Sequence, residues 1–207
     1  MILEGLVTTI GADGGLHVAA MGPHVDDAEA ERFATGVGAI GRLLLRPFPS
    51  SQTARNLLAS RQGVFHVIDD VLLVARVVTG VLGEPPATRP ATGVAGRVLE
   101  EACRAYEFEG VGVDDAQERL RLDARVRAVH EGRPFLGFNR GRHAVVEGAI
   151  LVTRLHILEH DEVDRRFREL AVLVQKTGGP REHEAFRLLE TRVSAARSRG
   201  LPTDGRA

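Results

Sequence analysis

The sequence predicts an α+β protein in which a body of about six antiparallel β-strands precedes a helical C-terminal part. Two periodicities support this division. Between residues 106 and 128 apolar and polar side chains alternate, as in half-buried strands, whereas after residue 160 apolar side chains recur at helical spacing. The 207 residues are enough for one full hydrophobic core with an appendage.

The first third of the chain combines β-forming runs with turn residues. Gly11–Gly15 separates two such runs and therefore predicts a hairpin. The predicted elements are a strand over 3–10, a second strand over 16–21, a helical turn over 28–35 and a third strand over 40–46 that Pro47 ends.

Capping residues define two short helices in the middle of the chain. Ser50 or Ser51 can cap a helix that runs to Ser60, and Asp69 or Asp70 can cap a helix that ends at Gly80. The other predicted elements are a strand over 64–68, the second helix over 71–79, a Gly- and Pro-rich loop over 83–96, a short helical stretch near 97–104 and two antiparallel strands within 106–128.

The last third is predicted to be helical. Asn139 can cap a helix that runs to about Leu158, and Gly178-Gly179-Pro180 separates two later amphipathic helices. The tail from Arg199 is expected to fray. The apolar stripes of the two later helices consist of Val163, Phe167, Leu170, Ala171 and Val174, and of Phe186, Leu189, Val193 and Ala196.

Composition excludes several classes of function. The net charge is −1, without the basic excess that nucleic-acid binding proteins show, and no apolar stretch is long enough to cross a membrane. The lone lysine, Lys176, makes Schiff-base chemistry improbable, and no Gly-Lys pair is available for a P-loop. One cysteine, Cys103, and residues 1–10 without a basic flank predict a cytoplasmic protein.

The pattern Gly36-Val-Gly38-Ala-Ile-Gly41 matches a dinucleotide-binding motif, but its context does not. Such a motif needs a strand before it, a helix after it and an acidic residue about 20 positions later. Helix-like residues precede it, Pro47 follows closely, and the next acid is Asp69. We interpret the segment as a glycine-rich bend that leads into a strand.

The charges are unevenly distributed around the predicted helix that ends at Ser60. No acid occurs between Arg32 and Ile68, although this window contains five arginines. The predicted strand that ends at Arg46 is followed by a hydroxyl-rich turn and a helix start. Free amides and the helix dipole favour an anion there, and a bound phosphate would supply the missing negative charge. The alternative is that the serines only cap the helix and that the arginines pair with acids elsewhere.

Three segments carry a resemblance to a known superfamily. They are His17-Val-Ala-Ala-Met21-Gly22-Pro23, then Arg46-Pro-Phe48 with Ser51-x-Thr53-x-x-Asn56-Leu57, and Gly63-Val-Phe65-His-Val-Ile-Asp69. Together they resemble FMN-binding split-barrel proteins, the superfamily of flavin reductases and pyridoxamine-phosphate oxidases. The likeness is closer to the domain-of-unknown-function family DUF447, and it extends to Phe138-Asn139-Arg140, Ala144–Glu147 and the terminal helices.

The resemblance implies an architecture and a cofactor. It implies a six-stranded antiparallel split β-barrel with FMN over residues 1–140, interrupted by the loop insertion near 83–96, and C-terminal helices over 141–200 packed on it. It also implies a homodimer with FMN near the subunit interface.

The site residues implied by the resemblance fall into three groups. Arg46, Ser51 and Thr53 would hold the phosphate, and Asn56 would support that turn or the flavin. Asn139 and Arg140 would close the site, from the same or the other subunit. The residues that would lie along the isoalloxazine are Ala20, Met21 and Gly22.

Several other residues allow both a structural and a functional interpretation. His156 and His160 would share one helix face as a metal pair or mark a solvated helix end, although we expect no metal site. Glu147 would pair with an arginine or transfer protons. His66 is expected to point inward and form hydrogen bonds, and Cys103 to be a buried apolar residue rather than a nucleophile.

Three functions remain open. The chain is an FMN-dependent oxidoreductase or flavin reductase acting on an unknown small molecule, a flavin carrier or sensor without turnover, or a dimeric barrel without flavin. No catalytic acid or base is identified from the sequence, and neither a nucleic-acid nor a membrane partner is expected.

Overall fold

A computed structural model describes residues 1–116 and 118–198, which form two compact units. One unit combines Met1–Ile68 with Pro86–Phe135, and the other combines Asp69–Pro85 with the chain from Leu136 onward. The helix over Val71–Thr79 therefore belongs to the second unit, although it lies between two strands of the first in sequence.

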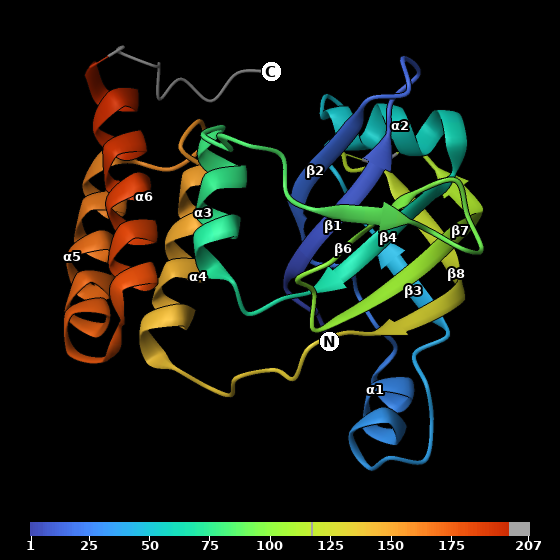
Figure 1. Ribbon diagram of the computed structural model, residues 1–207. Helices are drawn as coiled ribbons and strands as arrows, with labels where there is room; N and C mark the ends of the chain where they lie inside the picture. The colour runs from blue at the N-terminus through green and yellow to red at the C-terminus, as the bar shows by residue number, and fades with distance from the viewer. Residues whose placement is uncertain (117, 199–207) are drawn as a thin grey trace. The chain divides into compact units, whose positions relative to one another are not determined.

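The first unit is built on one six-stranded antiparallel sheet with the order β2-β1-β4-β7-β8-β3 (Figure 1). The predicted hairpin is confirmed, with Thr9 opposite His17 across its two strands. The strands are β1 (Gly5–Ile10), β2 (Leu16–Met21), β3 (Arg42–Leu45), β4 (Gln62–Val67), β7 (Arg104–Asp114) and β8 (Arg121–Glu131).

The two edges of this sheet are linked through His24. The backbone of His24 donates to the carbonyl of Leu44 at 2.8 Å and accepts from the Leu44 amide at 2.9 Å, and His24 also bridges to Ile2. Because His24 follows β2 and Leu44 lies in β3, the sheet curls until its edge strands are connected. The predicted α+β fold with a six-stranded split barrel is confirmed.

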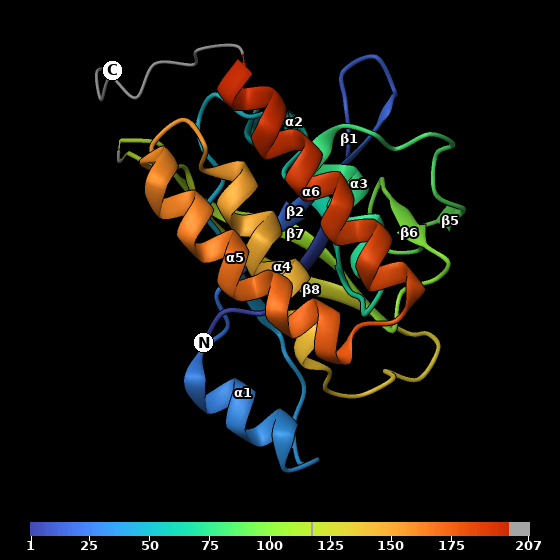
Figure 2. The same cartoon turned by 90° about the vertical axis from the view of Figure 1, so that its left-hand side faces the viewer.

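The inside of the barrel is filled by side chains that alternate along the strands. Phe65, Tyr106 and Phe108 are among the largest buried side chains, and the rings of Phe65 and Tyr106 stack at 6.3 Å. Helix α2 (Gln52–Ser60) packs on β1 and β2 at one end of this unit, and α1 (Asp27–Ala34) lies at the other (Figures 1 and 2).

A short hairpin covers part of the outer face of the sheet. It consists of β5 (Thr88–Pro90) and β6 (Arg97–Leu99), and Val98 packs against Val64 and Ala105. The helical stretch predicted near 97–104 is therefore wrong, because Arg97–Leu99 form a strand whose backbone pairs with β5. The segment predicted as a loop over 83–96 contains β5.

The second unit is a group of helices formed by α3 (Val71–Thr79), α4 (Arg140–Thr153), α5 (His160–Thr177) and α6 (Pro180–Ser198). Helix α4 packs against the other three, and α3 also packs against α6. Helix α4 ends at Thr153 rather than near Leu158. The amides of Ile157 and Leu158 both donate to the carbonyl of Arg154, so the chain forms a turn before α5 begins.

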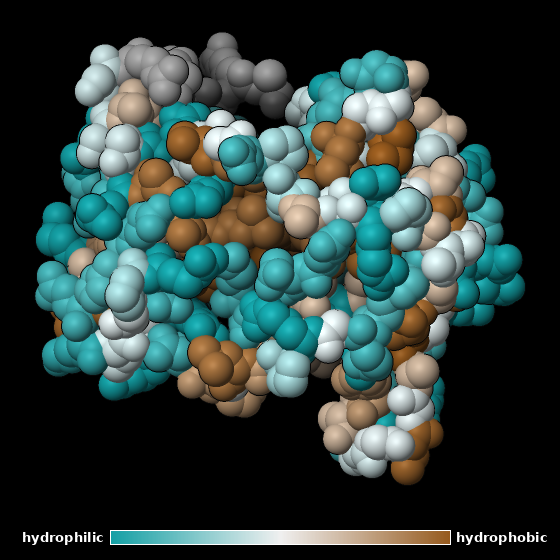
Figure 3. All heavy atoms as spheres, in the orientation of Figure 1, coloured by the Kyte–Doolittle hydropathy of each residue, from teal (hydrophilic) through white to brown (hydrophobic). Residues whose placement is uncertain are grey.

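Much of the surface in view is hydrophilic (Figure 3). The exposed apolar side chains include three close neighbours before α4, namely Phe135, Leu136 and Phe138. Among the described residues, no helix combines the length and hydropathy needed to cross a membrane.

Candidate functional site

The start of helix α2 forms where the sequence predicts it. Ser51 has an extended backbone, and its hydroxyl accepts a hydrogen bond from the amide of Ala54 at 3.1 Å. Of the two predicted caps, Ser51 is therefore the one used. The first turn of α2 contains no acidic residue, so no side chain of the helix itself neutralises the positive end of its dipole.

Two amides in this first turn have no acceptor among residues 1–116 and 118–198. The amide of Arg55 donates to the carbonyl of Ser51, and Ala54 donates to the Ser51 hydroxyl. The amides of Gln52 and Thr53 make no hydrogen bond to any other residue that the structure describes. A helix N-terminus with free amides and no local acid is suited to an anion.

The Thr53 hydroxyl is held by a histidine from the neighbouring hairpin. Thr53 is 2% exposed, and its Oγ1 lies 3.1 Å from Nε2 of His17 on β2. Burial and, after it, the charge of Arg55 lower the pKa of His17. His17 is therefore neutral near pH 7, and it fixes the position of the Thr53 side chain at the helix start.

Asn56 attaches the helix to the barrel. Its Nδ2 donates to the buried Thr9 hydroxyl at 2.9 Å, and its Oδ1 accepts from Nε2 of Gln52 at 2.7 Å. Because these contacts use both ends of the amide, they favour the expected role in supporting the turn over direct contact with flavin.

Arginines surround the helix start, and they form no ion pair with a carboxylate of the described residues. The guanidinium of Arg55 donates to the carbonyl of Ser50 at 2.7 Å and to Gln52, so it folds back over the first turn. Arg46, exposed after β3, and Arg119, which stacks over the Phe48 ring at 4.0 Å, make no ion pair with any described carboxylate. We call this region, Arg46 to Asn56 with His17, the α2 corner.

The three residues expected along the isoalloxazine lie at the end of β2. This strand is an edge of the sheet, so β1 pairs with only one of its two sides. Met21 packs toward the barrel core, whereas Ala20 faces the other way. Gly22 is closely approached, because a Cβ there would lie 2.7 Å from Cγ2 of Ile2 and 3.1 Å from a carboxylate oxygen of Glu4.

Asn139 and Arg140 lie at the start of α4, in the second unit. Oδ1 of Asn139 caps α4 by accepting from the Arg142 amide at 3.0 Å, and its Nδ2 donates to the carbonyl of Thr177 at 2.8 Å. The amide of Asn139 is therefore used inside the helical unit. Arg140 is exposed.

The contact of His17 with Thr53 was not predicted from the sequence, and neither were the roles of Thr9 and Arg119. Thr9 and His17 face each other across the predicted hairpin and point to the same side of the sheet. That register was a usable signal, because it places two polar side chains on the inward face, where α2 packs. Arg119 had no comparable signal, since it meets Phe48 only through the fold.

A second polar cluster lies on the outer face of the sheet. The carboxylate of Glu107, which is fully buried, accepts from the amides of Thr92 at 2.7 Å and Gly93 at 2.5 Å. It also accepts from the Thr92 hydroxyl at 3.2 Å and from Nε2 of His130 at 2.5 Å. Burial opposes ionisation, but these hydrogen bonds outweigh it and hold the pKa of Glu107 below its usual value. We call these groups the outer cluster.

His66 is adjacent to this cluster and is fully buried and hydrogen-bonded, as expected. The expected inward orientation is wrong, because His66 alternates with Phe65 of the barrel core and lies on the outer face, beneath β6. Its Nε2 accepts from the Leu99 amide at 3.0 Å, and its Nδ1 lies 3.3 Å from the carbonyl of Leu6, which assigns the proton to Nδ1. Burial is the main cause that lowers the pKa of His66 to about 4.

The remaining candidate residues do not form a further site in the described part of the chain. His156 lies in the turn after α4 and His160 begins α5, so the two do not share a helix face. Glu147 pairs with Arg166 at 3.4 Å, and Cys103 is buried. No group of three or more His, Cys, Asp or Glu side chains is arranged for a metal within the described residues. The Gly36–Gly41 segment joins α1 to β3, which agrees with a bend.

Family models match almost the whole length of the chain. A model described as the N-terminal domain of the protein of unknown function DUF447 matches residues 3–133, and a second, described as protein of unknown function DUF447, matches residues 139–191. No curated protein matches the chain.

Several solved structures are similar. An FMN-bound protein from Methanosarcina mazei of the DUF447 family is 20% identical, with a TM-score of 0.76, over 92% of this chain and 94% of that one. Flavoredoxin of Desulfovibrio vulgaris is 11% identical with a TM-score of 0.49, over 64% and 70% of the two chains. The styrene monooxygenase flavin reductase of Pseudomonas putida is 13% identical with a TM-score of 0.48, over 64% and 82%.

Proposed function

Because the chain belongs to the DUF447 family, whose models match residues 3–133 and 139–191, we propose that it is an FMN-binding flavoprotein. The observation that carries the proposal is the pair of amides, Gln52 and Thr53, that have no acceptor in the described part of the chain, at a helix start without an acid. The Methanosarcina mazei protein of the same family, which has a similar fold, is FMN-bound.

The donors of the α2 corner fit a phosphate monoester. Two free amides, the hydroxyls of Ser51 and Thr53, and the guanidinium of Arg46 provide several charge-assisted hydrogen bonds to a dianion. Among the described residues, the side chains of Arg46, Ser51 and Thr53 make no contact with a carboxylate that would compete for these donors.

The rest of the flavin would extend from this corner toward the end of β2. In this placement Ala20, Met21 and Gly22 lie along the isoalloxazine, where the unpaired side of the edge strand offers backbone groups to ring atoms. Asn56 supports the turn through Thr9. We propose Arg140 as a closing residue in a homodimer, since the Asn139 amide is already used within its own unit.

We further propose that the protein is an oxidoreductase of the flavin reductase type, acting on a small molecule. Bound FMN supplies the electron-transfer chemistry, and the protein binds and orients it. The residues of the α2 corner provide binding groups, and neutral His17 orients the Thr53 hydroxyl rather than acting as an acid.

The phosphate placement is tested by comparing two ligands. FMN carries a phosphate and riboflavin does not, so the double variant Arg46→Ala/Thr53→Ala should lose FMN affinity by roughly 10- to 100-fold and leave riboflavin affinity nearly unchanged. Binding is measured by quenching of flavin fluorescence. Arg168→Ala, at an exposed arginine of α5, is the matched control. Equal losses for both ligands would refute the placement.

The alternatives make different predictions for the purified protein. Yellow protein whose reduced flavin reoxidises only slowly with every acceptor offered would indicate a carrier or sensor rather than an enzyme. Colourless protein that takes up no added FMN would leave a barrel that does not bind flavin.

A further inference from the structure

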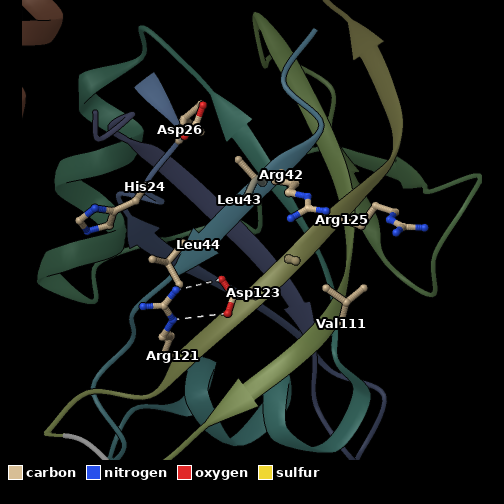
Figure 4. A pocket seen from close by; sticks show the side chains of 11 residues that line it. His24, Asp26, Arg42, Leu43, Leu44, Val111, Arg121, Asp123 and Arg125 are labelled. Atoms are coloured by element: carbon tan, nitrogen blue, oxygen red, sulfur yellow. Dashed lines mark hydrogen bonds and ion pairs between the residues drawn. The ribbon is translucent and has the colours of Figure 1, made fainter. Parts of the chain in front are cut away.

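A hollow on the outer face of β3 and β8 is lined by three arginines. It has a volume of about 390 Å³, and Arg42, Arg121 and Arg125 line it together with His24, Leu44 and Asp123. Figure 4 shows the side chains of Arg42 and Arg125 extending from neighbouring strands on the same side of the sheet. None of these residues belongs to the α2 corner.

Arg42 and Arg125 face each other directly across the two strands. They are register partners in the antiparallel pairing of β3 with β8. Cβ atoms of such partners are about 4.5–5.5 Å apart, and like charges in this position destabilise a sheet. This arrangement brings two guanidinium groups within reach of one small ligand.

The neighbouring carboxylates are engaged by other groups. Glu109, the register partner of Arg125 on β7, pairs with Arg127 at 3.7 Å. Asp123 accepts from Arg121 through both oxygens at 3.4 Å, as the dashed lines in Figure 4 show. Asp26 caps α1 by accepting the amides of Ala28 and Glu29.

A further acid near the hollow binds backbone. The Glu29 carboxylate accepts from the amides of Gly41 and Arg42 at 3.0 and 3.2 Å. Within the described residues, the guanidinium groups of Arg42 and Arg125 therefore make no ion pair. His24 adds little further positive charge, because burial, then Arg46 and the N-terminal amine, lower its pKa.

We propose that Arg42 and Arg125 together bind the phosphate group of a small molecule, at a second site separate from the α2 corner. Two guanidinium groups match a phosphate dianion in charge and present forked donors to its oxygens. Bound phosphate would also remove the repulsion between the paired arginines. The ligand is not the flavin phosphate, because FMN carries one phosphate and the α2 corner has its own donors for it.

Inorganic phosphate is the first probe. It is titrated into FMN-saturated protein at constant ionic strength, held with sodium chloride, and the thermal midpoint is followed. We expect a rise of about 2–4 °C in the unmodified protein. Arg42→Gln and Arg125→Gln should abolish this rise and, in phosphate-free buffer, should raise the midpoint because one of two facing positive charges is removed.

Two further proteins separate this site from other effects. Arg127→Gln is the matched control, since Arg127 lies on the same strand but already forms an ion pair with Glu109 at 3.7 Å, and it should keep the phosphate response. The variant Arg46→Ala/Thr53→Ala should also keep it, whether or not FMN binds. A response that persists in Arg42→Gln and Arg125→Gln, or no response in the unmodified protein, would overturn the proposal.

A second probe distinguishes the source of the phosphate group. Adenosine 2′-monophosphate should bind more tightly than inorganic phosphate if the ligand is a nucleotide whose apolar part covers Leu44 and Val111 in the hollow. Equal affinity, lost equally in both arginine variants, would identify free phosphate as the ligand.

Discussion

The α2 corner and the outer cluster contain similar hydrogen-bond donors, but only the outer cluster contains a carboxylate that accepts from them. Each includes a histidine, a threonine hydroxyl and backbone amides from a turn or helix start. In the outer cluster a buried carboxylate, Glu107, accepts from every one of these donors. In the α2 corner there is no carboxylate, and the amides of Gln52 and Thr53 have no acceptor among the described residues.

This difference separates a structural polar cluster from a binding site. Glu107 supplies an internal anion, so the donors around it are satisfied and the segment with β5 and β6 is fixed to the sheet. The donors of the α2 corner would be satisfied by an anion that the chain does not supply. Both regions are therefore explained by where the negative charge comes from.

Removing the internal anion should have the largest effect. Glu107→Ala leaves two amides and His130 without their acceptor in a buried place, so we expect the free energy of unfolding to fall by about 3–5 kcal/mol. Urea unfolding measures this loss. FMN affinity, measured at low urea on protein that remains folded, should change little.

Glu107→Gln is the matched variant. It keeps the size and one acceptor oxygen but removes the charge, so its stability should lie between those of the parent and Glu107→Ala. A strong loss of FMN affinity in folded Glu107→Gln would break the comparison, because it would connect the outer cluster to flavin binding.

Acid should weaken the outer face of the sheet through His66. The folded pKa of His66 is about 4, below its usual 6.5, so between these values the unfolded state binds a proton that the folded state does not. Stability from His66 is therefore complete above pH 6.5 and is lost as pH falls toward 4, by up to about 3 kcal/mol. The lowered pKa of Glu107 extends the loss to still lower pH.

Unfolding free energies at several pH values test this assignment. In His66→Gln, whose side chain can still accept from Leu99 and donate to Leu6, the slope between pH 6.5 and 4.5 should be much smaller. An unchanged slope in this variant would show that another group is responsible.

Local patterns predicted the barrel strands and the start of α2. The turn at Gly11–Gly15, the alternation in β7 and β8, and the two candidate caps Ser50 and Ser51 all depend on residues close in sequence. The acid-free window was also visible, since it is a property of consecutive residues. These features were predictable because the physics that produces them acts over a few residues.

The outer cluster was not predictable in this way. Glu107 contacts Thr92 and His130, which are 15 and 23 residues away, and the loop that contains Thr92 has no periodic pattern. The same applies to Thr53 and His17, which are 36 residues apart. The helix predicted near 97–104 failed because its residues are placed by the sheet beneath them, not by local propensity.

An anion supplied by the chain at the α2 corner should compete with FMN. Gln52→Glu places a carboxylate in the first turn of α2, where it favours the helix by about 0.3–1 kcal/mol but repels a phosphate. Because the lost Gln52 donor to Asn56 offsets part of this gain, stability should change by less than about 1 kcal/mol. FMN affinity should fall about tenfold or more, and riboflavin affinity should stay constant.

Gln62→Glu is the matched control, since it makes the same change outside the corner. Gln62 binds the amide of Ala95 through its Oε1, an interaction that a glutamate retains. Its affinity for FMN should equal that of the parent. If Gln52→Glu bound FMN as tightly as the parent, the free amides would not be the phosphate site.

The smallest expected effect is a change in the pKa of His17. In the protein without ligand, burial and Arg55 hold the pKa of His17 below its usual value. A phosphate dianion at the α2 corner would favour the protonated imidazole, so FMN should raise the pKa of His17, whereas riboflavin should not. Proton NMR titration of the His17 ring, assigned with His17→Gln, measures the shift. His66 provides an internal reference, because its environment is closed by Leu6 and Leu99 and should not respond to either ligand. If FMN raised the pKa of both histidines, or of neither, the phosphate would not bind at the free amides of the α2 corner.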